Sequence, residues 1–150
     1  MTKLLMRFAL IGGVVVVALP LTAQVSPTTT KAEGVRIARG PELESCNDYL
    51  TIIRWTTNNP GGSPVHYGVV HYGIKPNELS QTAKSPIRLN PDHPSTIFRV
   101  RLEGLQPGMT YYYTVESEES NRTSDGVKSA TKRFTVNPQP RDASPQPACR

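Results

Sequence analysis

Apolar and polar residues alternate along several short runs of this chain. In the run TIFRVRL at 96–102, Phe98, Val100 and Leu102 fall on one side of an extended chain and two arginines fall on the other. A period of two is typical of a β-strand that is buried on one face. No stretch carries apolar residues at helical spacing over the length that a helix needs. The pattern therefore predicts an all-β protein.

The β-rich runs are short, and turn-forming residues separate them. The clearest turn is the Asn-Asn-Pro-Gly-Gly segment at 58–62, which follows an apolar run. Short strands divided by turns at regular spacing are typical of a β-sandwich. We predict an immunoglobulin-like sandwich of about seven antiparallel strands, near 35–38, 50–57, 65–72, 96–102, 110–116 and 130–136, with a weaker pair near 79–83 and 87–89.

The same alternation selects the side chains of the core. In the run TYYYTVE, for example, Tyr111 and Tyr113 face inward while Tyr112 faces outward. The run at 65–72 carries apolar residues on both faces, so its orientation stays open. The predicted core consists of Ile53, Trp55, Phe98, Val100, Leu102, Tyr111, Tyr113, Val115, Phe134 and Val136.

The amino terminus has the three parts of a secretory signal peptide. Lys3 and Arg7 precede an apolar run, and small residues allow cleavage after Ala23. The stretch from Phe8 to Ala23 has 16 residues, fewer than the roughly 20 of a membrane-spanning helix. We expect residues 1–23 to direct export to the periplasm, the cell envelope or the outside of the cell. An uncleaved membrane anchor is the alternative.

Composition divides the remaining chain into three parts. Residues 24–33, rich in Ser, Thr and Pro, are expected to form a linker, and residues 137–150, with four prolines, a disordered tail. Residues 34–136 have the size of one sandwich domain. Without Lys3 and Arg7, 15 of the 17 Lys and Arg residues remain against 12 Asp and Glu. This net charge of +3 is spread along the chain, so no nucleic-acid partner is expected.

Two cysteines remain in the exported part of the chain, Cys46 and Cys149. In an oxidising compartment they could form one disulfide. Pairing between two chains and a free thiol at Cys149 are the alternatives. The sequence leaves all three open.

The segment LQPGMTY at 105–111 resembles the tyrosine corner of fibronectin type III domains. In that family a Leu-x-Pro-Gly turn leads into a strand whose first inward Tyr bonds back to the backbone of the turn. Pro107 favours a turn, Gly108 admits a positive φ, and the polar tip of Tyr111 needs a partner. Trp55 matches the core tryptophan of the same family.

A closer resemblance, over about 34–136, is to the fibronectin-like domain that precedes the catalytic domain of purple acid phosphatases. It is carried by IIRWTTNNPGGSPV at 52–65, VVHYG at 69–73, GLQPGMTYYYTV at 104–115 and RFTV at 133–136. In those enzymes the ligands of two metals lie in the catalytic domain that follows. Here the sequence ends about 14 residues after the last expected strand. We therefore expect no phosphatase chemistry from this chain alone.

Candidate catalytic and metal-binding residues form no familiar pattern. His66 and His71 lie five apart on one expected strand, hence on opposite faces, and His93 lies in a distant loop. We expect ordinary surface histidines, because a metal site needs three or four convergent ligands. No serine lies in a Gly-x-Ser-x-Gly turn. A solvated loop is expected for the four carboxylates Glu116, Glu118, Glu119 and Asp125. We predict no catalytic residue, no metal site and no cofactor.

The candidate binding surface is basic. The strands that carry Arg54 and the pair Arg99 and Arg101 are neighbours in such a sandwich, so the three guanidiniums share one outward face. They could bind sulfate, carboxylate or lipid phosphate groups bidentately. Tyr112, outward on the opposite sheet, could stack on a sugar ring or dock a partner. The alternative is a solvated face that prevents aggregation.

These observations favour an exported, non-enzymatic binding or scaffolding module. Its partner is expected to be a protein or an anionic polysaccharide in the cell envelope or outside the cell, with membrane contact only if the signal segment is retained. The first alternative is an accessory subunit or truncated relative of a secreted purple-acid-phosphatase-like metallophosphoesterase. The second is a membrane-tethered adhesin.

Overall fold

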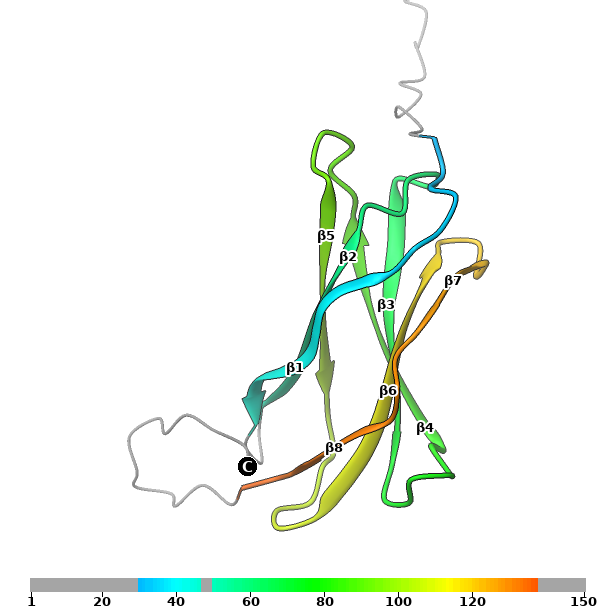
Figure 1. The fold of residues 1–150 in the computed structure, drawn as a ribbon. Coiled ribbons are helices and arrows are strands. Elements are labelled where there is room, and N and C mark those ends of the chain that lie inside the picture. Colours follow the sequence, from blue (N-terminus) through cyan, green and yellow to red (C-terminus); the bar gives the residue numbers. More distant parts are fainter. Residues whose placement is uncertain (1–29, 47–49, 138–150) are drawn as a thin grey trace, which may run out of the picture.

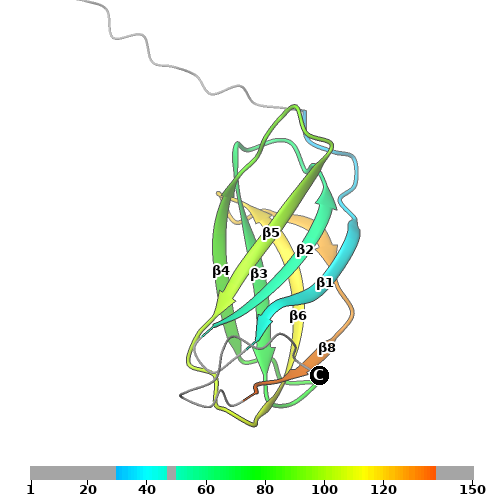
Figure 2. The ribbon, with the colours of Figure 1, turned by 90° about the vertical axis from the view of Figure 1, so that its left-hand side faces the viewer.

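The computed structural model describes residues 30–46 and 50–137, and this part of the chain is all-β. Two sheets pack face to face, one in the order β1-β2-β5 and the other in the order β4-β3-β6-β7, with β8 also pairing with β6 (Figure 1). Every pairing is antiparallel. In Figure 2 the three-stranded sheet lies in front of the larger one. The predicted immunoglobulin-like sandwich is confirmed. Its strands are β1 (Ile37–Cys46), β2 (Thr51–Asn58), β3 (Val65–Gly73), β4 (Gln81–Arg88), β5 (Ser95–Leu102), β6 (Thr110–Glu119), β7 (Ser124–Lys128) and β8 (Lys132–Thr135).

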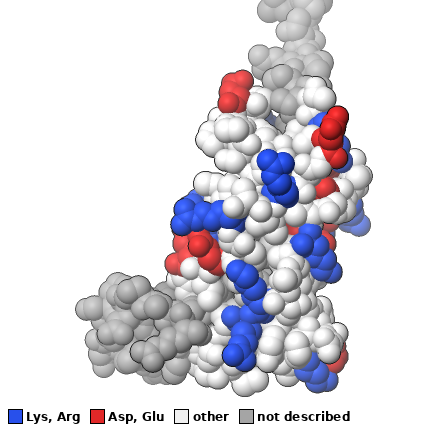
Figure 3. Space-filling view, in the orientation of Figure 1, with Lys and Arg blue, Asp and Glu red and all other residues white. Residues whose placement is uncertain are grey.

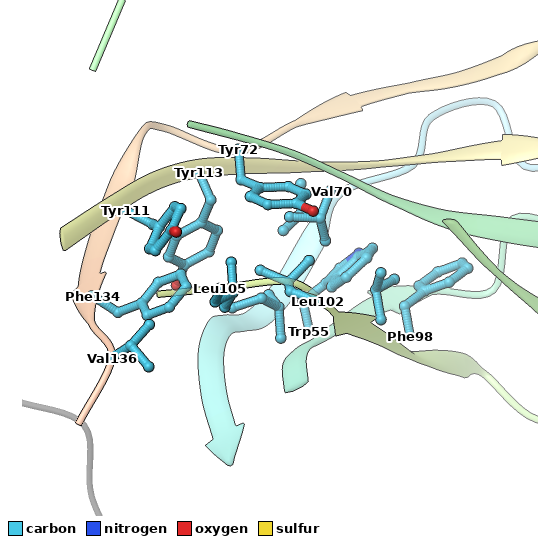
Figure 4. Close-up of a cluster of buried hydrophobic side chains, with 13 residues drawn as sticks. Trp55, Val70, Tyr72, Phe98, Leu102, Leu105, Tyr111, Tyr113, Phe134 and Val136 are labelled. Atoms are coloured by element: carbon cyan, nitrogen blue, oxygen red, sulfur yellow. The ribbon is translucent and has the colours of Figure 1, made fainter. Parts of the chain in front are cut away.

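The interior is filled by large side chains from both sheets (Figure 4). The ring of Phe134 packs against those of Tyr111 and Tyr113, whose centroids are 5.8 and 5.7 Å away. Burying each such side chain contributes roughly 1.5–3 kcal/mol to folding. All ten predicted core residues are buried. The structure adds Val70, Tyr72 and Leu105 to the cluster.

Several expected strand boundaries are wrong. The first strand is longer than 35–38, and β1 pairs with β2 through three register shifts, which hide its period of two. The weaker pair at 79–83 and 87–89 is one continuous strand, β4. β6 extends to Glu119 and turns back into β7, which the sequence did not predict. The described chain therefore has eight strands, close to the predicted number of about seven.

The outer side of the larger sheet is partly covered. Val69 and Val70 point to opposite faces of β3, yet both are buried. Thr114, on the same face of β6 as Tyr112, is also buried. The connections at 76–79 and 128–131 border a hollow around Thr114, and Ser129 bonds to the backbone of Val115. These connections therefore help to bury the outer face of the central strands, whose inner face packs on the other sheet.

Features near the chain ends are only partly described. Ala32, in the expected linker, donates its N–H to Pro60 O at 2.8 Å, so residues 30–33 lie against the sandwich. Cys46 is disulfide-bonded, and its Sγ lies 3.4 Å from Thr135 O at the end of β8. Cys149, the other cysteine of the sequence, lies outside the described residues, as does the expected signal segment. Within 30–46 and 50–137, no helix is long and apolar enough to cross a membrane.

Candidate functional site

The three arginines of the predicted binding surface lie on one outward face. Arg54 of β2 is directly opposite Arg99 of β5, and Arg101 follows two residues along the same strand. Arg99 and Arg101 are exposed and Arg54 is half-buried. The strands are neighbours as predicted, so strand pairing alone brings the guanidiniums together. Like charges directly opposite one another repel unless other groups compensate them.

Each of these arginines has a carboxylate beside it. Arg54 Nη1 lies 3.2 Å from Glu42 Oε1, and Arg99 Nε lies 2.7 Å from Glu44 Oε2. Arg101 Nε lies 3.3 Å from Glu103 Oε1. We call these six residues the charged ladder. The hydrogen bond to Glu44 raises the pKa of Arg99. In Figure 3 the basic side chains of the face shown are scattered, several of them beside acidic ones. Exposed ion pairs add little stability, so their members can exchange partners.

Tyr112 lies on the other sheet, away from the charged ladder. It is half-buried on the outward face of β6, opposite Gly73 of β3 and Arg133 of β8. This orientation agrees with the sequence prediction. The structure does not bring Tyr112 and the three arginines into one site.

A second group of polar side chains lies inside the sandwich, where none was expected. We call His66, Glu119 and Asp125 the His66 cluster, in which one possible ligand atom from each lies within 4.8 Å of the others. The His66 and Asp125 side chains are both 0 % exposed, and His66 Nε2 lies 3.3 Å from Asp125 Oδ1. The expectation of a surface histidine is wrong for His66. The expected solvated loop is wrong for Asp125, because β7 carries it inward.

Neighbouring groups hold the carboxylates of this cluster. Ser117 Oγ donates a hydrogen bond to Asp125 Oδ2 at 2.7 Å. The ammonium group of Lys31 donates to Glu119 Oε1, and this hydrogen bond, with smaller contributions from the charges of Glu119 and Asp125, raises the pKa of Lys31. Glu119 remains 13 % exposed at its side chain and Lys31 43 %. The cluster is therefore closed on the side of Asp125 and open on the side of Lys31.

His71 lies on the opposite face of β3, as predicted. Its Nε2 lies 2.8 Å from Glu116 Oε1 and its Nδ1 lies 3.0 Å from Thr82 Oγ1. This side chain is part-exposed and hydrogen-bonded at both ring nitrogens. The two histidines cannot share an ion. The spacing of the two histidines does not exclude an ion held by His66 together with Glu119 and Asp125.

Comparison with known proteins identifies the domain. The family of the purple acid phosphatase N-terminal domain matches residues 48–136, which is more than half of the chain. The chain belongs to this family. The match is to the N-terminal domain of those enzymes, so an enzyme is not indicated. No curated protein matches the chain. Among solved structures, the sensor domain of the anti-sigma factor RsgI4 from Pseudobacteroides cellulosolvens matches 75 % of this chain and 98 % of its own, with 14 % identity and a TM-score of 0.49.

The tyrosine corner of this purple acid phosphatase N-terminal domain has the geometry that its sequence predicts. Gln106 donates its backbone N–H to the hydroxyl of Tyr111 at 3.1 Å. Gly108 has a φ of 77°, and Met109 N bonds to Gln106 O across the turn. The His66 cluster was not predicted from the sequence. His66 shares its strand face with Val70 and Tyr72, but the other face of this strand is also apolar, so the sequence did not show which face is inward.

Proposed function

We propose that this purple acid phosphatase N-terminal domain is an exported, non-enzymatic binding module. The charged ladder is its contact surface for a protein or an anionic polysaccharide in the cell envelope or outside the cell. The observation that carries the proposal is the direct opposition of Arg54 and Arg99 on a solvent-facing sheet. Side chains fill the interior between the sheets, which leaves partner recognition to the surface.

The glutamates of the ladder favour an exchange mechanism. A carboxylate or sulfate that approaches Arg99 must displace Glu44, which holds Nε at 2.7 Å. Because the pair is exposed, this displacement costs little. A partner that presents both acidic and basic groups can bind Arg99 and Glu44 at once. The ladder therefore fits a mixed-charge protein surface at least as well as a uniform polyanion.

Salt-dependent retention on a sulfated polyanion column tests the surface. We expect the triple variant Arg54→Ser, Arg99→Ser, Arg101→Ser to elute at lower salt than the unchanged protein. The matched control changes three exposed basic residues of the larger sheet, Arg88, Lys128 and Arg133, to Ser. If both variants elute at the same lower salt concentration, retention depends only on net charge. The charged ladder would then not be the contact surface. Mass spectrometry of the mature amino terminus tests export, and an intact segment 1–23 would favour the tethered adhesin.

The family match supports a second candidate, an accessory subunit or truncated relative of a purple-acid-phosphatase-like metallophosphoesterase. Its partner would supply the catalytic metals. Phosphatase assays of the purified chain with added Fe³⁺ and Zn²⁺ distinguish the binding module from the accessory subunit. Activity of the chain alone would overturn the non-enzymatic proposal. Activity only after addition of a co-purified partner would favour the accessory subunit.

A further inference from the structure

Strand pairing brings the three members of the His66 cluster together at one end of the larger sheet. His66 is the second residue of β3, Glu119 is the last of β6 and Asp125 is the second of β7. His66 and Glu119 are direct partners in the register of β3 and β6. This end, uppermost in Figure 1, is where β6 turns back into β7. Because strands and not loops carry the side chains, the arrangement is fixed by the fold.

The cluster has polar atoms that the described residues do not satisfy. Neither ring nitrogen of the fully buried His66 has a hydrogen-bond partner among them, nor has Asp125 Oδ1. Burying such groups without partners is costly, and folded proteins rarely do so. His66 Nε2 and Asp125 Oδ1 lie 3.3 Å apart without forming a hydrogen bond. A group bound between them would satisfy both Nε2 and Oδ1.

The separation of the two buried ligand atoms fits a zinc ion. Zinc binds imidazole nitrogen and carboxylate oxygen at about 2.0–2.2 Å in tetrahedral geometry, which places neighbouring ligand atoms roughly 3.3–3.5 Å apart. The observed separation of His66 Nε2 and Asp125 Oδ1 is 3.3 Å. We propose that His66, Asp125 and Glu119 form a zinc site, with His66 Nε2, Asp125 Oδ1 and one Glu119 oxygen as ligands.

Two neighbours fit this assignment. Ser117 bonds to Oδ2 of Asp125 and leaves Oδ1 for the ion, as outer groups do for ligating carboxylates. Lys31 places a positive charge next to Glu119, where an ion would place its own. The Lys31 side chain is 43 % exposed, so it can move into water when zinc binds. Water completes the coordination on this open side. This site is independent of the charged ladder.

The test uses the untagged full chain after removal of metals with a chelator. Calorimetric titration with Zn²⁺ is expected to give one ion per chain. Zinc at a hundredfold excess over its Kd should raise the midpoint of thermal unfolding by at least about 5 °C. Co²⁺ in place of zinc should give the visible absorption of a tetrahedral site.

Variants separate the cluster from other histidines and carboxylates. Glu119→Gln changes a part-exposed ligand and leaves the core intact, and it should weaken zinc binding at least tenfold. Asp125→Asn should do the same. Ser117→Ala should weaken binding roughly tenfold to hundredfold and shift the Co²⁺ absorption, because Ser117 positions Asp125. The matched control is His71→Gln, which removes the outward imidazole beside Glu116 and should leave stoichiometry and affinity unchanged.

Three results would overturn the assignment. They are no saturable binding of Zn²⁺ to the unchanged chain, undiminished binding to Glu119→Gln, or loss of binding in His71→Gln. The first would identify His66 and Asp125 as a buried pair without an ion. None of these results bears on retention by the polyanion column.

Discussion

Trp55 of β2 and Phe98 of β5 are cross-strand partners whose rings stack with their centroids 5.2 Å apart and an angle of 18° between their planes. Gly68 of the facing sheet closes this stack. A Cβ at Gly68 would lie 2.9 Å from Trp55 Cη2, 3.1 Å from Phe98 Cδ1 and 3.1 Å from a methyl group of Val100. The two sheets approach closely here because residue 68 has no side chain.

Gly68→Ala is therefore expected to destabilise the fold by about 1–3 kcal/mol, since the added methyl group overpacks a rigid aromatic stack. Urea unfolding measures the change. The matched control is Gly34→Ala, because a Cβ there meets nothing within 4 Å. Equal stabilities of the two variants would contradict the close approach of the sheets.

Tyr111→Phe is expected to lower stability by about 0.5–1.5 kcal/mol, because the backbone N–H of Gln106 loses its acceptor. Tyr112→Phe makes the same chemical change on the outward face of the same strand and should alter stability by less than about 0.5 kcal/mol. Chemical denaturation compares the two. A larger loss in Tyr112→Phe would mean that the tyrosine corner does not stabilise the domain.

Alkaline pH should destabilise the domain through Tyr113. Burial raises the pKa of this phenol from 10.0 to about 12, and the charge of Glu42 adds to the effect. Because the folded pKa is the higher one, the contribution is complete below pH 10 and is lost as the pH rises through about 12. The expected loss is about 2 kcal/mol. Urea unfolding across this window measures it. Tyr113→Phe should show a shallower dependence, and superimposable curves would contradict the assignment.

Removing two carboxylates from the charged ladder should strengthen polyanion binding. The double variant Glu42→Gln, Glu44→Gln frees Arg54 and Arg99 from their neighbours and should elute from the column at higher salt. The control makes the same charge change elsewhere, at Glu33 and Glu78. If the elution of the control shifts to the same salt concentration, the effect comes from net charge. The glutamates then do not limit the access of the polyanion to the arginines.

Much of the fold could be predicted because several strands show a clear alternation of apolar and polar residues. In β5, the inward residues Phe98, Val100 and Leu102 are apolar and the outward residues from Ile97 to Arg101 are exposed, so the period of two determines the orientation. The tyrosine corner could also be predicted, since the residues that form it lie within one short turn of the sequence. The outward placement of Arg54 opposite Arg99 followed from the order of the strands alone.

The remaining features depend on interactions that a single segment does not show. β1 was underestimated because its register shifts interrupt the alternation. The burial of Asp125 depends on β7, a five-residue strand that contains a glycine and two charged residues and looks like a loop. His66 was assigned to the surface by residue type, whereas its position in the strand placed it inside. This strand carries apolar residues on both faces, so the period of two did not show which side of it faced inward.

The borders of the two sheets limit how a partner can bind. β1 contains Pro41 and β4 contains Pro86, which have no N–H to donate. β7 and β8 share one border and have only five and four residues, and β5 lies against β4. Such borders are poor templates for an added strand. Recognition by β-augmentation, in which a peptide extends a sheet, is thereby disfavoured, and a partner must read side chains on the faces or turns.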